Sequence, residues 1–216
     1  MDSTREIKLS KIIKLQKIKK TVQEYNKNYT ILNECSIEID KGDMVAITGQ
    51  SGIGKSTLLN IIGCLDQPSS GNYWLNQKDL TMLTLKEQAL IRKKTFGYIF
   101  QQYWLIKHLT ILENIELALS YSNSAGSEHQ KKATQALKRV GLEQHIHHYP
   151  MHLSGGQQQK ASIARAIVTK PSIIIADEPT GALDNHSSLQ IMHLLRDINM
   201  TQKTTIIVVT HDKNIA

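Results

Sequence analysis

A glycine-rich segment, GQSGIGKST at residues 49–57, is the strongest chemical signal in the sequence. It lies between the apolar runs MVAIT and LLNIIG, so it matches G-x-x-x-x-G-K-[ST] placed between a predicted strand and a predicted helix. Its glycines let successive backbone N–H groups point at phosphate oxygens, and the helix adds its positive N-terminal end. Lys55 can reach β- and γ-phosphates as a point charge, and the Ser56 hydroxyl can ligate Mg²⁺. The segment predicts a nucleotide site rather than an ordinary flexible connection.

Two adjacent carboxylates, Asp177 and Glu178, follow the apolar run SIIIA and precede Pro179. Charge at the tip of a buried strand is costly unless it is paired or binds a metal. Successive strand residues point to opposite faces, so Asp177 can face Mg²⁺ while Glu178 acts as the general base for a water molecule at the γ-phosphate. An ordinary polar turn is the alternative, and the segment at 49–57 weighs against it.

Gln101 and His211 each follow another predicted strand, FGYIF and TTIIVVT respectively. Ligands of open α/β sheets bind beyond the carboxyl ends of the strands. A lone glutamine or histidine at such a place is usually structural. Here four strand ends deliver a glycine loop, a glutamine, an Asp-Glu pair and a histidine to one side, which favours a shared functional site.

A second glycine-rich helix start lies in HLSGGQQQKASIARAI, residues 152–167. Ser154 and Gln157 have the spacing of a capping box, but Gly155 and Gly156 then occupy the first turn. Each glycine costs up to about 1 kcal/mol relative to alanine in a helix interior. The hydroxyl, the exposed N–H groups and the positive helix end together predict an anion site, separate from the one at 49–57.

Short apolar runs predict the strands that position these groups, because strands buried on both faces read as continuous β-branched runs. Helix-like segments separate most of the runs, which indicates an α/β architecture. The turn-rich segment 67–80 predicts a hairpin. The strands expected to be fully buried are 44–48, 96–100, 172–176 and 204–210.

Residues 103–170 contain no convincing strand and predict a helical insert, whose last helix ends before Pro171. Within the insert, capping-box patterns occur at Thr110 with Glu113 and at Ser127 with Gln130. A final helix is expected to place four apolar residues at helical spacing in the core. They are Leu189, Met192, Leu195 and Ile198.

The chain of 216 residues is 40% apolar and 21% charged, an ordinary soluble composition. Its two cysteines, Cys35 and Cys64, form no disulfide framework and fit a reducing compartment. No apolar run approaches the ~18–20 residues of a spanning helix, and no signal-peptide core is visible. We therefore expect that this chain crosses no membrane by itself.

Much of the net charge of +7 lies near the N-terminus, with six lysines between Lys8 and Lys20. Read as a strand, this segment places Ile7, Leu9, Ile13 and Leu15 on one face, whereas a helix would scatter its apolar residues. We expect a lysine-studded strand at a solvated sheet edge, where lysines discourage further pairing. A patch that binds DNA or a membrane is the alternative.

The sequence resembles the nucleotide-binding subunit of ATP-binding cassette (ABC) transporters over about residues 13–216. The motifs that carry this resemblance are GQSGIGKST, FQ at Gln101, LSGGQ, IIIADEP and TH at His211. The resemblance implies an α/β fold with a RecA-like P-loop NTPase core, an antiparallel β subdomain and an inserted helical subdomain. Residues 1–216 would form one ABC ATPase domain, with the core and β subdomain at about 7–102 and 171–216 and the helical subdomain at about 103–170.

The same resemblance implies ATP and Mg²⁺ as ligands and assigns further roles. Glu178 would be the catalytic base, His211 the γ-phosphate switch, and Gln101 a magnesium contact that reports to a membrane subunit. Asp184 would couple two sites across a dimer, and the Ser154 loop would hold the phosphate of ATP bound to the other copy. Tyr25 best fits the position that stacks on adenine, with Tyr29 as its rival.

The sets implied in this way are the following. ATP contacts are expected at Tyr25, Gly49, Ser51, Gly52, Gly54, Lys55, Ser56, Thr57, Asp177, Ser154, Gly155, Gly156, Gln157 and Asp184. Magnesium contacts are expected at Ser56, Gln101 and Asp177. One departure from the family pattern is Lys160, which stands where an arginine is usual.

The resemblance predicts an ATPase that dimerises around two ATP molecules and drives separate integral membrane subunits from the cytoplasmic face of the membrane. The motif sequences are most similar to those of the branch that serves lipoprotein release, macrolide export, cell division and antimicrobial-peptide export. The surface near Gln101 and residues 103–109 would receive the membrane subunit.

Two other functions are weighed against transport. A soluble ABC-type ATPase acting on nucleic acid or the ribosome is suggested by the basic charge. It is disfavoured because the chain has one cassette and no long coiled coil, so no direct nucleic-acid partner is expected. A regulatory module without hydrolysis is disfavoured because Glu178 and His211 are both present.

Overall fold

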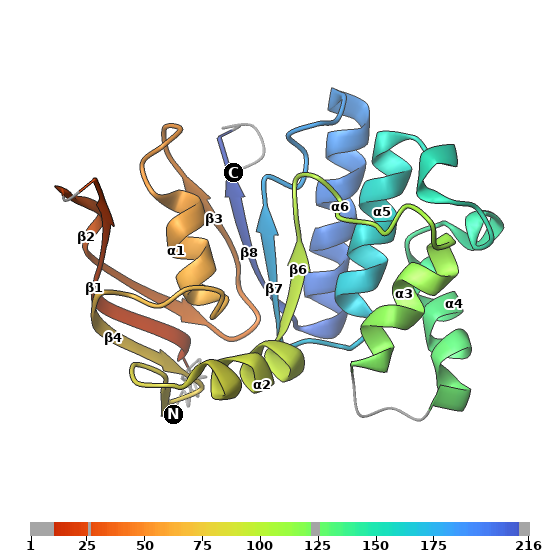
Figure 1. Cartoon of the computed structure of the whole chain (residues 1–216). Helices are drawn as coiled ribbons and strands as arrows, with labels where there is room; N and C mark the ends of the chain where they lie inside the picture. Colours follow the sequence, from red (N-terminus) through yellow and green to blue (C-terminus); the bar gives the residue numbers. More distant parts are fainter. Residues whose placement is uncertain (1–10, 26, 122–125, 212–216) are drawn as a thin grey trace, which may run out of the picture.

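The computed structural model describes residues 11–25, 27–121 and 126–211 and places their strands in two sheets (Figure 1). The antiparallel sheet has the order β2-β1-β4-β5 and consists of β1 (Lys11–Glu24), β2 (Lys27–Asp40), β4 (Ser70–Leu75) and β5 (Lys78–Asp79). The parallel sheet has the order β3-β8-β7-β6 and consists of β3 (Met44–Thr48), β6 (Phe96–Ile99), β7 (Ile173–Asp177) and β8 (Thr205–Thr210). The α/β architecture and the hairpin within 67–80 are confirmed.

Helices lie on both faces of the parallel sheet (Figure 1). On the face toward the antiparallel sheet lies α1 (Lys55–Ile62), and α2 (Leu85–Thr95) leads directly into β6. Beyond the other face lie α3 (Ile111–Ser120), α4 (His129–Arg139), α5 (Gly155–Ile167) and α6 (Asn185–Gln202). Short 3₁₀ segments, η1 (Gly126–Glu128), η2 (Glu143–His145) and η3 (Pro150–His152), connect α3, α4 and α5.

The parallel sheet serves two hydrophobic cores, because successive side chains of a strand point to opposite faces. Ile173 and Ile175 of β7 pack with α1 and the antiparallel sheet, whereas Ile174 packs with the helices of the other face. This double burial explains the continuous apolar runs of β7 and β8. The prediction of a fully buried strand is wrong for β3. It lies at an edge of the sheet, and its residues Ala46 and Thr48 are exposed.

The lysine-rich segment is a strand, but the predicted edge position is wrong. β1 lies inside the antiparallel sheet and pairs with both β2 and β4. Its apolar face is buried at Ile13 and Leu15, while the predicted members Ile7 and Leu9 lie outside the described residues. Lys11 forms an ion pair with Glu38 on β2. Lys11, Lys14 and Lys17 are exposed on this interior strand, whereas Lys20 is half-buried and pairs with Asp66.

Two of the predicted helix caps are confirmed, at Thr110 and at Ser154. The one at Ser127 is wrong: that residue lies in η1, and α4 begins after Glu128 without a side-chain cap. Sequence reasoning missed a further capping box at Thr84, which begins α2.

The core face of α6 is confirmed at Leu195 and Ile198, which are buried, and Met192 is partly buried. It is wrong at Leu189, which is 58% exposed, and Ile191 is buried instead. The shift follows from packing, because α6 lies against the parallel sheet and α5, and those neighbours select which side of the helix is covered.

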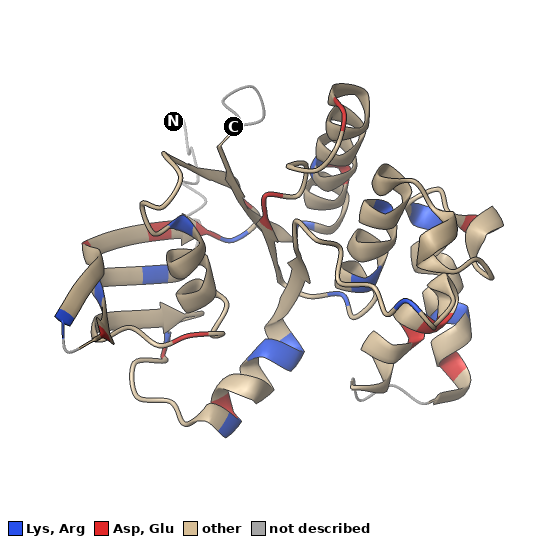
Figure 2. Ribbon diagram, turned by 45° about the horizontal axis from the view of Figure 1, so that its top comes forward, with Lys and Arg blue, Asp and Glu red and all other residues tan. Residues whose placement is uncertain are grey.

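Lys and Arg residues occur on the antiparallel sheet, on α2 and on the helices beyond the parallel sheet (Figure 2). Cys35 and Cys64 are both free thiols, and burial raises the pKa of Cys64 to about 11. Among the described residues, no helix combines the length and the apolar character needed to cross a membrane.

Candidate functional site

The four strands of the parallel sheet end on one side, and each carries predicted site residues at or just past its carboxyl end. Across the sheet the order is the glycine loop after β3, His211 after β8, Asp177 and Glu178 at the end of β7, and Gln101 after β6. Parallel pairing of neighbouring strands causes this alignment. The structure thus brings together the groups that the sequence placed at strand ends.

The glycine loop between β3 and α1 has a backbone that only glycine adopts easily. Gly52 and Gly54 have φ values of +80° and +97°, in the left-handed region. The loop closes on Lys55, whose Nζ donates hydrogen bonds of 2.8 Å to the carbonyl oxygens of Gly49 and Gln50. Because α1 begins at Lys55, its first-turn N–H groups lack helical acceptors and face this loop.

Ser56 and Thr57 lie in the first turn of α1, and Ser51 is exposed in the loop. The Ser56 Oγ lies 3.4 Å from Oδ1 of Asp177. Burial raises the pKa of Asp177, against the opposing effect of this hydrogen bond. A hydroxyl beside a partly desolvated carboxylate is a pair of hard oxygen donors, which suits Mg²⁺.

Glu178 and His211 form a second pair at neighbouring strand ends. The Oε1 atom of Glu178 and Nδ1 of His211 lie 2.9 Å apart. The backbone N–H of Glu178 donates to the carbonyl of Val209 at 2.9 Å, and Glu178 has φ of +46°. This conformation is uncommon for residues other than glycine and is often found at functional sites.

Gln101 and Glu178 converge on Gly181. A β-carbon at Gly181 would lie 3.0 Å from Nε2 of Gln101 and 3.2 Å from Oε2 of Glu178. Any side chain at this position would therefore enter the space between the amide and the carboxylate. Sequence reasoning missed Gly181, although its position shortly after the Asp-Glu pair offered a signal.

The capping box at the start of α5 is formed in both directions. The backbone N–H of Gln157 donates to Ser154 Oγ at 3.3 Å, and the N–H of Ser154 donates to Gln157 Oε1 at 2.9 Å. The Nε2 atom of Gln157 also lies 3.3 Å from Nε2 of His145 in η2. Gly155 and Gly156 follow the cap, so their N–H groups belong to the first turn, where helical acceptors are lacking.

Side chains of this chain itself lie against both glycines. A β-carbon at Gly155 would lie 2.9 Å from Oη of Tyr103 and 3.3 Å from Leu183 Cδ2. At Gly156 it would lie 3.2 Å from Ser187 Oγ. Sequence reasoning considered only an anion and missed these neighbours, because they come from segments that no local pattern connects to α5.

Asp184 caps α6. Its carboxylate accepts hydrogen bonds from the N–H of Ser187 at 2.9 Å and from the Ser187 hydroxyl at 2.6 Å. These hydrogen bonds hold the pKa of Asp184 below its usual value, and the bond from the Ser187 hydroxyl has the largest effect. The role expected for Asp184 across a dimer stays a prediction.

The two candidates for adenine stacking lie at different places on the β1–β2 hairpin. Tyr25 is 98% exposed at the turn, whereas Tyr29 is 49% exposed on β2. Tyr29 shares a strand face with Ile31, whose side chain would lie 3.1 Å from a β-carbon at Gly54. The assignment of Tyr25 or Tyr29 to adenine stacking stays a prediction.

Residues 32–181 match the family described as "ABC transporter". The macrolide export ATP-binding/permease protein MacB of Vibrio parahaemolyticus is 43% identical over 205 residues, which cover 95% of this chain and 31% of that protein. The uncharacterized ABC transporter ATP-binding protein YknY of Bacillus subtilis is also 43% identical over 205 residues, covering 95% of this chain and 89% of that protein. The chain thus spans less than a third of the length of the MacB relative and most of the length of YknY.

Solved structures have the same architecture. A dimeric post-hydrolysis state of the ATP-binding cassette MJ0796, bound to ADP and Pi, matches with a TM-score of 0.86 at 42% identity, covering 94% of this chain and 90% of that one. The cbiO1 protein of Clostridium perfringens, part of the transporter complex cbiONQ, matches with a TM-score of 0.85 at 29% identity, covering 95% and 80%.

Proposed function

The chain belongs to the ABC transporter family and is an ATP-binding, ATP-hydrolysing subunit, and on this premise we propose how its site works. Two copies close head to tail around two ATP molecules. Each ATP lies between the glycine loop of one copy and the Ser154 helix start of the other. The observation that carries this proposal is the presence of two separate phosphate-type helix starts in one chain, at Lys55 and at Ser154.

Within one copy, Lys55 and the first turn of α1 bind the phosphates. Ser56 and Asp177 would hold Mg²⁺ together with Gln101, and the bound ion neutralises phosphate charge. Glu178 accepts a proton from the attacking water, and His211 orients its carboxylate through the 2.9 Å contact. Gly181 keeps open the space where the Gln101 amide meets Glu178.

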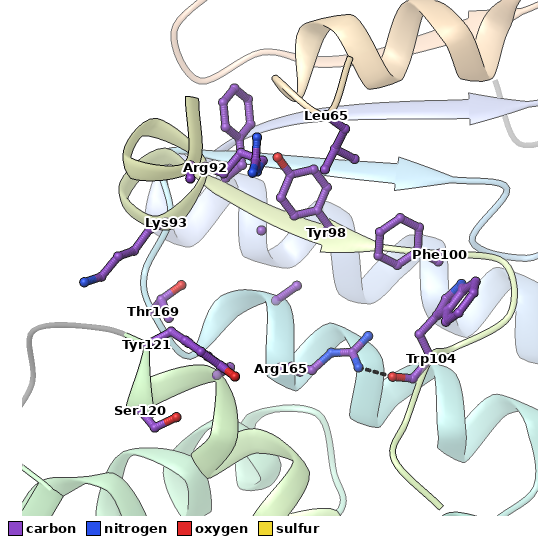
Figure 3. A pocket seen from close by; sticks show the side chains of 15 residues that line it. Leu65, Arg92, Lys93, Tyr98, Phe100, Trp104, Ser120, Tyr121, Arg165 and Thr169 are labelled. Atoms are coloured by element: carbon purple, nitrogen blue, oxygen red, sulfur yellow. Dashed lines mark hydrogen bonds between the residues drawn. The ribbon is translucent and has the colours of Figure 1, made fainter. Parts of the chain in front are cut away.

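The proposed docking site for a membrane subunit is a cavity of about 1000 Å³ bordered by α2, β6, α3 and α5 (Figure 3). Tyr98, Phe100 and Trp104 line it in and after β6, and Tyr121 lies on the side of α3. Trp104 also lines a second cavity of about 830 Å³, together with Gln101 and Leu105. The expected partner surface near Gln101 thus adjoins the larger cavity.

The larger cavity fits a short amphipathic helix of the membrane subunit. Its lining is largely apolar and aromatic, Arg92 and Lys93 contribute positive charge, and no Asp or Glu of the described residues lines it. An apolar helix face carrying a carboxylate would complement it in shape and charge. Such docking would place the chain on the cytoplasmic face of the membrane, and export of a peptide, lipoprotein or drug-like molecule would follow from the membrane subunit.

The shared site is tested by mixing two defective variants. Lys55→Ala disables the glycine loop, and Gly155→Asp places negative charge at the helix start that faces the partner's phosphate. A mixed head-to-tail dimer contains one doubly defective site and one intact site. We expect each variant alone to be inactive and the mixture to regain magnesium-dependent ATP hydrolysis.

The readouts are phosphate release and ATP-driven dimer formation by light scattering. Lack of recovery at every mixing ratio would contradict the shared site. So would full activity of the Gly155→Asp chain alone. Wild-type chain diluted with an inactive Lys55→Ala/Gly155→Asp chain serves as the control for simple dilution of sites.

A further inference from the structure

The turn that follows β6 is attached to α5 at two widely separated places. The guanidinium of Arg165 donates hydrogen bonds to the carbonyl oxygens of Tyr103, at 2.8 Å, and of Trp104 (Figure 3). The Tyr103 hydroxyl reaches the opposite end of the helix, where it occupies the space beside Gly155. Gly155 and Arg165 lie about 15 Å apart along α5, since a helix rises about 1.5 Å per residue.

The turn has a backbone conformation that needs such support. Tyr103 and Trp104 have φ values of +30° and +51°, and two successive bulky residues in the left-handed region are strained. Strain of this kind persists only where the surrounding contacts over-determine the conformation. Arg165 supplies such contacts from a partly buried position, and this partial burial lowers the pKa of its guanidinium.

The same turn carries Gln101 into the chain's own ATP site. Gln101 precedes Tyr103 by two residues, and its amide meets Glu178 at Gly181. The start of α5, at Ser154 and Gly155, is the part that serves the ATP of the other copy in the proposed dimer. The turn therefore connects two parts of one chain, Gln101 and the start of α5, that act in different ATP sites of the proposed dimer.

We propose that Tyr103 and Arg165 are positioning residues that set the start of α5 relative to Gln101. This inference rests on the proposed head-to-tail dimer. A displacement of Gln101 at the chain's own site moves the Tyr103 hydroxyl against Gly155 and so moves the helix start offered to the partner. A side chain at Gly155 would press on the Tyr103 hydroxyl, so either the tyrosine or the start of α5 would have to shift.

A double substitution separates this idea from a glycine required by the phosphate alone. Gly155→Ala places a β-carbon 2.9 Å from Tyr103 Oη, whereas the ring atom Cζ lies 3.9 Å away. Tyr103→Phe removes only the hydroxyl, so it removes the collision and keeps the ring. If the phosphate alone required glycine, removal of the Tyr103 hydroxyl would have no effect on the alanine variant.

The experiment uses the full chain carrying Glu178→Gln, with ATP-driven dimerisation measured by light scattering and ATP binding by a fluorescent nucleotide. We expect Gly155→Ala to weaken dimerisation about tenfold. Adding Tyr103→Phe should recover most of that loss, and the affinity of the monomer for ATP should change by no more than about twofold. Absence of recovery in the double variant overturns the proposal. If the Glu178→Gln parent itself does not dimerise with ATP, the head-to-tail dimer fails instead.

Arg165 is tested separately with Glu178 intact. Lysine keeps the charge but replaces the two separate Nη donors of arginine with a single Nζ on a shorter side chain, so Arg165→Lys should lower kcat about tenfold and leave the KM for ATP within about twofold. Arg139→Lys is the matched control, since Arg139 donates to Thr201 on α6, away from the turn. An unchanged kcat in the folded Arg165→Lys chain, checked by its Tm, contradicts the role of Arg165.

Discussion

Glu178 and His211 lie at the ends of adjacent parallel strands, with Oε1 and Nδ1 2.9 Å apart. The sheet sets this distance, because β7 and β8 are hydrogen-bonded up to the residue before Glu178. The pair gives the carboxylate a fixed orientation toward the space that it shares with Gln101 at Gly181. A general base needs such positioning before its pKa matters.

Replacement of Glu178 by glutamine should slow turnover while leaving ATP binding in place. The substitution keeps the shape of the side chain but removes the proton acceptor, so we expect ATP hydrolysis to fall about 10²–10⁴-fold. The measurements are single-turnover hydrolysis and nucleotide affinity. Glu128→Gln, which removes an exposed ion pair with Lys132, is the control. Turnover equal to wild type would remove Glu178 from the role of base.

Substitutions in two capping boxes of the same geometry can distinguish an effect on stability from an effect on dimerisation. Thr110→Ala and Ser154→Ala each remove a side-chain acceptor at a helix start, so each should lower the free energy of unfolding by about 0.5–2 kcal/mol. Only Ser154→Ala should also weaken ATP-driven dimerisation, because in the proposed dimer only the start of α5 lies against the partner's ATP. Chemical denaturation and light scattering measure the two effects. Equal dimerisation in both variants would argue against the role of Ser154.

Asp177 should lower the free energy of unfolding once the pH exceeds the pKa that this residue has in the native state. Burial holds its pKa above that of the unfolded chain, so the native state binds more protons between the two pKa values. The free energy of unfolding from this group therefore falls as the pH rises through that window.

Asp177→Asn removes the ionised form, so at neutral pH and without nucleotide we expect stability to rise by up to about 1 kcal/mol. The corresponding rise in Tm is about 2–4 °C. Magnesium-dependent hydrolysis should be lost at the same time. Asp184→Asn is the control of opposite sign: its carboxylate has a lowered pKa, so stability should fall at neutral pH. A lower Tm for Asp177→Asn would contradict the burial effect.

Substitution in the larger cavity should affect the membrane partner and leave the isolated ATPase unchanged. Tyr121 lines the cavity and is 69% exposed, so Tyr121→Ala removes contact area without opening a core. We expect normal dimerisation and basal hydrolysis but at least about tenfold weaker co-purification with the proposed membrane subunit. Tyr149→Ala, at an exposed tyrosine outside this cavity, is the control. Equal retention of the membrane subunit by both variants would place docking elsewhere.

Sequence reasoning succeeded where the signal is local or periodic. The glycine loop, the strand ends at Asp177 and Gln101, and the caps at Thr110 and Ser154 depend on residues that are close in the chain. Their conformations follow from short-range sterics and hydrogen bonding. The parallel alignment of the strand ends followed as well, because buried parallel strands have a recognisable composition.

Strand order was decided by tertiary structure alone. The lysine-rich β1 is an interior strand and the apolar β3 lies at an edge, the reverse of what composition indicated. Neighbouring strands pair through backbone hydrogen bonds, which nearly every residue type can form. The composition of a strand therefore indicates whether a face is buried, but not how many strands pair with it.

The sequence by itself determined that this chain has two glycine-rich helix starts and a parallel sheet whose strand ends gather the loop at 49–57, Gln101, the carboxylate pair and His211. Only the tertiary structure decided that Tyr103 occupies the space beside Gly155 and that Gln101 meets Glu178 at Gly181. These contacts join segments far apart in the chain, and their geometry depends on how a strained turn lies across a helix. No local propensity encodes such packing, because it exists only once the helices and the sheet have assembled.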